Sequence, residues 1–143
     1  MQEFVRQFGL LSADRTPCGK PLASSDAHAL MVLLDAGEDG MLSSSLAARL
    51  GIDKSTASRL TGRLTERGYL APAPSTDDGR ARPACLTRKG VRVAREVDQA
   101  SRARFADVLE HVPARRRGEV IAALRDIVSA LERMTASRGD QKP

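Results

Sequence analysis

The spacing of apolar residues predicts a mainly helical chain. Residues 2–12 place apolar side chains at helical intervals and predict a short amphipathic helix. Residues 13–24 contain two prolines and a glycine, which predict a loop. Residues 26–35 are apolar over most of the helix circumference, so this helix should lie in the middle of a domain. We expect Ser24 or Ser25 to cap it.

A short helix and a longer one come next. Residues 46–50 repeat apolar side chains at helical spacing and end at Gly51, which suits a helix C-terminus. Asp53 is a favourable N-cap for a second helix that runs to Gly68. This second helix has only a narrow apolar stripe, and Ser, Arg and Gly occupy its other face. It is therefore suited to contact with a polar, anionic partner.

The remaining segments predict a hairpin and two long helices. Residues 69–71 and 83–86 flank a segment rich in Pro, Ser, Asp and Gly, which indicates a two-stranded hairpin. Thr87 should cap a helix to about His111, and Pro113 suits the first turn of the last helix. That last helix carries two apolar stripes, so it needs a helical partner in this chain or another. The main stripe consists of Val120, Leu124, Ile127, Leu131 and Met134.

Composition narrows the class of protein. The 143 residues are 41% hydrophobic and 29% charged, which allows a packed core in one domain or one domain with a helical extension. Aromatic residues are only 3%, so base stacking on aromatic platforms is not expected. There is no long apolar run or secretory signal, and Cys18 and Cys85 form no disulfide framework, so we expect a cytoplasmic protein without a membrane partner.

Positive charge is concentrated in the middle of the sequence. The chain carries a formal net charge of +5, and residues 54–92 alone hold nine basic residues against three acidic ones. The basic segment coincides with the polar helix and the hairpin. A helix fits the major groove of DNA, and arginine on a hairpin fits the minor groove. The order of elements therefore predicts a helix-turn-helix followed by a wing.

Two segments resemble the MarR (multiple antibiotic resistance regulator) family of winged-helix transcription factors. They are LAARLGIDKSTASRLTGRLTERGYL over residues 46–70 and DGRARPACLTRKG over residues 78–90. In the second, Asp78, Arg80, Leu86 and Thr87 match the family pattern D-x-R-x5-L-T. The resemblance implies a homodimer that binds a pseudo-palindromic operator in double-stranded DNA and usually represses a nearby gene. A small-molecule inducer is a further implied partner.

The resemblance also implies a division of the chain. We expect an N-terminal dimerisation helix and loop over residues 1–25, a winged helix-turn-helix over 26–87, C-terminal dimerisation helices over 88–136 and a flexible tail over 137–143. The fold class is mainly α with a small β-hairpin. The implied DNA-binding residues are Lys54, Ser55, Thr56, Ser58, Arg59, Arg63, Asp78, Arg80 and Arg82.

These residues have different expected roles. The Ser and Thr side chains and Arg59 should read base edges or phosphates, and Arg63 should bind phosphate. Arg80 should enter the minor groove, with Arg82 as a second wing cation, while Asp78 should orient the wing through an ion pair. Arg59 and Arg80 should therefore project from one surface.

The signal that releases the regulator is left open by the sequence. Cys18 lies near Arg15 and Lys20, which favour a reactive thiolate, and the peroxide-sensing branch of the family uses a cysteine. An unreactive loop cysteine is the alternative. A metal or metalloid could use Cys18 and His28 with Glu3, Asp35 or His111, although a histidine on an apolar helix is more often an interior residue. An organic effector is the third alternative. Cys85 should simply fill space near the wing.

The sequence disfavours two other classes of function. Sequence motifs of a P-loop, a nucleophile elbow or a zinc protease are absent, so an enzyme is not expected. A helical protein-interaction module without sequence-specific DNA binding would explain the helices. It would not explain why the basic residues gather on the polar helix and hairpin.

Overall fold

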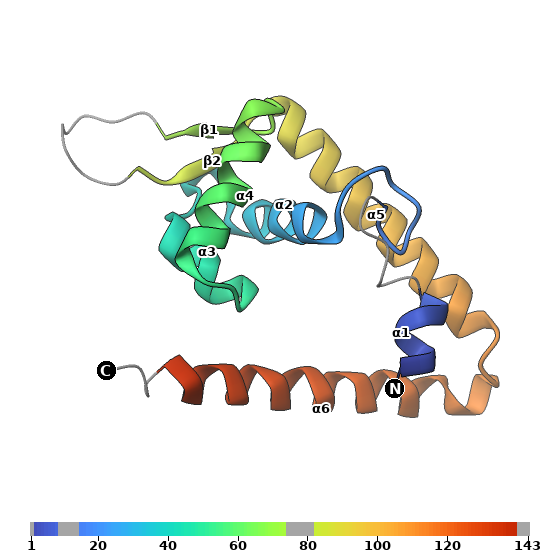
Figure 1. The fold of residues 1–143 in the computed structure, drawn as a ribbon. Coiled ribbons are helices and arrows are strands. Elements are labelled where there is room, and N and C mark those ends of the chain that lie inside the picture. Colours follow the sequence, from blue (N-terminus) through green and yellow to red (C-terminus); the bar gives the residue numbers. More distant parts are fainter. Residues whose placement is uncertain (1, 9–14, 74–81, 140–143) are drawn as a thin grey trace. The chain divides into compact units, whose positions relative to one another are not determined.

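A computed structural model describes residues 2–8, 15–73 and 82–139 of the chain (Figure 1). The helices are α1 (Gln2–Phe8), α2 (Ser24–Ala36), the short 3-10 helix η1 (Gly37–Asp39), α3 (Ser43–Leu50), α4 (Lys54–Glu66), α5 (Arg88–Glu110) and α6 (Ala114–Gly139). The strands are β1 (Leu70–Pro72) and β2 (Ala84–Leu86). The predicted mainly helical class with a two-stranded hairpin is confirmed. Over these residues, no helix is long and apolar enough to cross a membrane.

The chain forms two compact units, residues 1–104 and residues 105–143. The core of the first unit surrounds α2, as its apolar circumference predicted. Leu30 and Leu33 are fully buried there. Side chains from α3, α4 and α5 complete the same core: Leu46, Leu60, Leu64 and Val97.

Local capping signals place most helix ends correctly. Asp53 caps α4, and Gly51 ends α3 in a left-handed conformation with φ of 65°. Thr87 Oγ1 accepts the Gly90 N–H at 3.0 Å and so caps α5.

The expected serine cap of α2 is wrong. The N-cap is Ala23, whose carbonyl oxygen accepts the Ala27 N–H at 3.0 Å. Because the helix begins one residue earlier than a Ser24 cap would require, both serines lie inside its first turn. Ser24 Oγ is consequently buried and has no hydrogen-bond partner within the described part of the chain.

The hairpin is joined firmly to its neighbours. Strands β1 and β2 pair antiparallel with Leu70 opposite Leu86, and Met41 extends the pairing through a bridge to Ala84 (Figure 1). Cys85 Sγ donates to the carbonyl oxygen of Glu38 at 3.5 Å, in keeping with its expected space-filling place near the wing. Gly40 allows β2 to lie this close to the segment before α3, because a Cβ on Gly40 would lie 2.5 Å from the Ala84 carbonyl oxygen.

The second unit is mainly α6. Four large apolar side chains on this helix are about half exposed: Ile127 at 49%, Val128 at 53%, Leu131 at 55% and Met134 at 56%. Three of them belong to the stripe predicted from sequence. These side chains expose a continuous apolar face within the unit.

Candidate nucleic-acid interface and effector pocket

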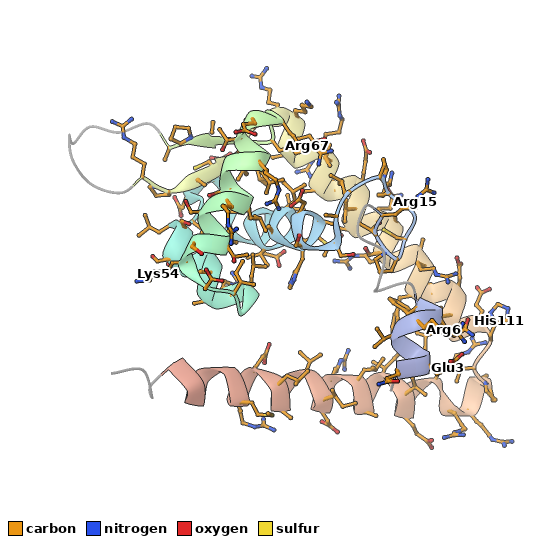
Figure 2. The ribbon with its side chains drawn as sticks, viewed as in Figure 1. Glu3, Arg6, Arg15, Lys54, Arg67 and His111 are labelled. Carbon is orange, nitrogen blue, oxygen red and sulfur yellow. The ribbon has the colours of Figure 1, made fainter. Side chains whose placement is uncertain are left out.

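Helix α4 has one buried side and one exposed polar side. Ala57, Leu60 and Leu64 are buried in the core. The exposed side contains most of the predicted DNA-binding residues of this helix: Lys54, Ser55, Ser58, Arg59 and Arg63. Figure 2 shows Lys54 and Arg67 at the two ends of the helix. The narrow apolar stripe thus leaves a basic, hydroxyl-rich face open to a partner.

Asp53 fixes the first turn of α4. Its Oδ1 accepts the Ser55 hydroxyl at 2.6 Å and the Thr56 N–H at 2.9 Å. Its Oδ2 accepts the Thr56 hydroxyl at 2.7 Å. These hydrogen bonds, the one from Ser55 first, hold the pKa of Asp53 well below its ordinary value, so the carboxylate stays charged.

The side chains of Ser55 and Thr56, which are predicted to read base edges or phosphates, are therefore already oriented. Each hydroxyl donates its proton to Asp53, so its oxygen is left to accept hydrogen bonds. Arg59 Nη2 lies 3.3 Å from Thr56 Oγ1, so the hydrogen-bonded network of Asp53 and Thr56 extends to the exposed arginine. The sequence predicts Asp53 as the cap of α4 but does not predict that its carboxylate also orients these two hydroxyl groups.

Arg63 has a partner that sequence analysis did not find. Its Nη2 lies 2.8 Å from Oδ1 of Asp26, a buried residue in the first turn of α2. Arg67 Nη1 lies 3.6 Å from the other carboxylate oxygen. The sequence did contain a signal for this ion pair. Asp26 is an acidic residue on a largely apolar helix, and a buried carboxylate needs a compensating cation.

The wing is described in part. Arg82 is exposed beside β2. Asp78 and Arg80 lie outside the described residues, so their roles, and the shared surface of Arg59 and Arg80, stay predictions. At the base of the hairpin, Arg67 and Lys89 lie 5.3 Å and 4.9 Å from the centre of the Tyr69 ring.

The two candidate sensing residues, Cys18 and His28, line the same pocket of about 260 Å³ in the first unit. The other lining residues are mostly apolar, with a few hydroxyls and one arginine: Phe8, Thr16, Pro17, Ser24, Ala27, Met31, Val97, Ser101 and Arg104. His28 is exposed to this pocket, so the expectation of an interior histidine is wrong. Its position in α2 faces away from the core residue Leu30, which is two residues further along the helix.

Cys18 is held in a network of hydroxyl groups. Its Sγ lies 3.0 Å from Thr16 Oγ1 and accepts from Ser101 Oγ at 3.6 Å. Partial burial raises the pKa of the Cys18 thiol, but hydrogen bonds with Thr16, with Ser101 and with backbone N–H groups outweigh it. The pKa therefore lies below that of an ordinary cysteine. Over residues 2–8, 15–73 and 82–139, no group of three His, Cys, Asp or Glu side chains could hold a metal ion.

Comparisons with known proteins agree with this geometry. The model of the MarR family matches residues 21–81. No curated protein sequence matches the chain. Among solved structures, Rv1404 from Mycobacterium tuberculosis is 22% identical with a TM-score of 0.69, over 90% of this chain and 89% of that one.

Two further structures show the same fold. A MarR transcriptional regulator from Methanosarcina mazei Go1 is 21% identical with a TM-score of 0.66, over 92% of this chain and 85% of that one. CouR from Rhodococcus jostii RHA1, solved with bound p-coumaroyl-CoA, is 22% identical with a TM-score of 0.57, over 74% of this chain and 70% of that one.

A helix-turn-helix with an exposed basic second helix, followed by a hairpin wing, defines the winged-helix architecture that is typical of DNA-binding transcription regulators. Residues 21–81 span α2, α3, α4 and the first wing strand, the elements that carry this definition. Residues 21–81, less than half of the chain, are thus similar to the MarR family. Proteins of this family are transcription regulators and not enzymes.

Proposed function

We propose that this protein binds a pseudo-palindromic operator as a homodimer, with α4 of each subunit in the major groove and the wing at the adjacent minor groove. One observation carries the proposal: the outer face of α4 presents Arg59 beside hydroxyl groups that Asp53 holds in place. Oriented hydroxyls and arginine are the groups that read base edges. The cations around them supply phosphate contacts, which fix position on the duplex.

Dimerisation follows from the apolar face of α6. Ile127, Val128 and Met134 are each about half exposed in the single chain. A second copy would cover them with an identical face, and a two-fold operator would offer one half-site to the α4 helix of each subunit. We expect the operator to contain two half-sites that are one helical turn apart.

The pocket beside Cys18 is the proposed effector site. Its lining is largely apolar, and Arg104 and His28 offer polar contacts to an anionic group. Ser24 Oγ, buried at the same pocket, is an available hydrogen-bond donor. A small aromatic or aliphatic carboxylate fits this chemistry, and CouR supports the principle of a small-molecule ligand in this fold. We propose that such a ligand releases a repressor from DNA.

Oxidation of Cys18 is a second candidate for the releasing signal. The lowered pKa of its thiol increases the reactive thiolate fraction, and the pocket exposes it to small oxidants. Peroxide should then weaken DNA binding of the wild type and of Cys85→Ser, but not of Cys18→Ser. Release in all three proteins, or in none, would exclude this signal.

Selection from a random-sequence duplex pool tests the DNA-binding proposal. The bound fraction should converge on a two-fold symmetric sequence, and log affinity should fall linearly with log salt concentration. A pool that does not converge, with an affinity insensitive to salt, would favour the protein-interaction module instead.

A further inference from the structure

Asp26 is a buried carboxylate to which neither the DNA interface nor the pocket assigns a role. Its side chain is only 5% exposed in the first turn of α2, where the helix N-terminus favours an anion. Its ion-pair partners within the described part of the chain, Arg63 and Arg67, both come from the end of the recognition helix α4. The carboxylate therefore joins the central helix of the core to the element that contacts DNA.

The arginines of α4 form a row that turns toward α2. Arg59, Arg63 and Arg67 follow one another every four residues, and each step turns the side chain about 40° further round the helix. Arg59 lies on the outer face, whereas Arg63 reaches the flank that contacts α2. A helix in the major groove has phosphates at its flanks, so Arg63 is placed for the DNA backbone.

The two side chains of the Asp26–Arg63 ion pair differ in burial. The Arg63 side chain is 51% exposed and the Asp26 side chain 5%, so the guanidinium lies between the carboxylate and the solvent. The contact to Asp26 uses Nη2 at 2.8 Å. A guanidinium has five N–H donors in a rigid plane, so its exposed part can bind a phosphate while the other part is held. Holding it reduces the side-chain entropy lost on binding.

We propose that Asp26 is a positioning residue for DNA binding, which fixes the Arg63 guanidinium so that its exposed edge binds one phosphate of the operator. The inference rests on the proposed function, because it requires α4 to lie in the major groove. It adds a buried residue outside the DNA interface to those that determine affinity. Asp26 acts through Arg63 and makes no DNA contact itself.

The test compares the salt dependence of four proteins on a duplex recovered by the selection above: wild type, Asp26→Asn, Arg63→Gln and the double variant. Each phosphate contact contributes about 0.9 to the slope of log affinity against log salt. We expect Arg63→Gln to lower the slope by about 0.9 and Asp26→Asn to lower it by a similar amount. The double variant should lose no more than Arg63→Gln alone.

Asp35→Asn is the matched control, because it removes the same charge from an exposed position on the same helix and should keep the wild-type slope. An unchanged slope in Asp26→Asn or in Arg63→Gln would overturn the inference, as would a steeper slope in Asp26→Asn. If Asp26→Asn does not fold, as judged by circular dichroism, an unchanged slope in Arg63→Gln is by itself enough to overturn the inference. A wild-type protein without salt-dependent binding would refute the proposed function instead.

Discussion

Among the glycines that the structure describes in residues 15–73 and 82–104, Gly90 is the most tightly packed, and it offers a direct test of how α5 is joined to the wing. A Cβ at Gly90 would overlap the carbonyl oxygen of Tyr69 and would lie 3.1 Å from Leu86 Cδ2. The Gly90→Ala variant must therefore move the first turn of α5 away from the hairpin. That shift strains the hydrogen bond from the Thr87 N–H to the Tyr69 carbonyl oxygen, which is 2.9 Å long.

The expected change in the free energy of unfolding of Gly90→Ala is the sum of opposing contributions. Overpacking costs about 1–3 kcal/mol, and one weakened hydrogen bond costs about 1 kcal/mol. Alanine recovers about 1 kcal/mol over glycine inside a helix. The net expectation is a loss of about 1–3 kcal/mol in the free energy of unfolding.

Gly62→Ala is the matched control. Gly62 lies inside α4, and a Cβ there meets nothing within 4 Å. This variant should gain about 0.5–1 kcal/mol. Urea unfolding followed by circular dichroism measures both variants against the wild type at one protein concentration. Gly90→Ala that is as stable as the wild type would refute the packing described for this junction.

Three more predictions follow from other parts of the chain. Arg80→Ala should weaken operator binding by about 1–3 kcal/mol in a duplex titration while the circular dichroism spectrum stays unchanged, and wild-type affinity would remove Arg80 from the interface. Thr16→Val should shift the pH profile of Cys18 alkylation by iodoacetamide, measured in a Cys85→Ser background, to higher pH, because the Thr16 hydrogen bond lowers the thiol pKa; an unchanged profile would contradict that cause. Ile127→Asp should convert a dimer to a monomer in analytical ultracentrifugation, whereas the exposed Arg102→Ala should not; a dimer of Ile127→Asp would exclude this face as the interface.

Local signals explain why the elements could be predicted from sequence. Asp53, Gly51 and Thr87 act on backbone groups within three or four residues, so their effect is visible in the sequence itself. The narrow stripe on α4 is equally local, because the helical period determines which side chains share a face. The exposed side of α4 was accordingly predicted correctly.

Contacts between segments that are distant in the chain account for the features that the sequence did not predict. Asp26 and Arg63 are separated by 37 residues, and only the packing of α2 against α4 brings them together. The exposure of His28 depends on the pocket, which α2 shares with α5 and the loop at Cys18. Helix α2 starts at Ser24, with Ala23 as its N-cap, and it follows a loop in which the Thr16 N–H donates to the Lys20 carbonyl oxygen.

The outer face of α4 is most directly tested by competition between a selected duplex and a mixed-sequence duplex for wild type, Arg59→Ala and Arg102→Ala. Loss of a base contact costs about 1–3 kcal/mol, so Arg59→Ala should reduce the preference for the selected duplex by roughly 5- to 150-fold. Arg102→Ala, which removes an exposed arginine from α5, should keep the wild-type preference. An Arg59→Ala protein that discriminates as well as the wild type would contradict base recognition by Arg59.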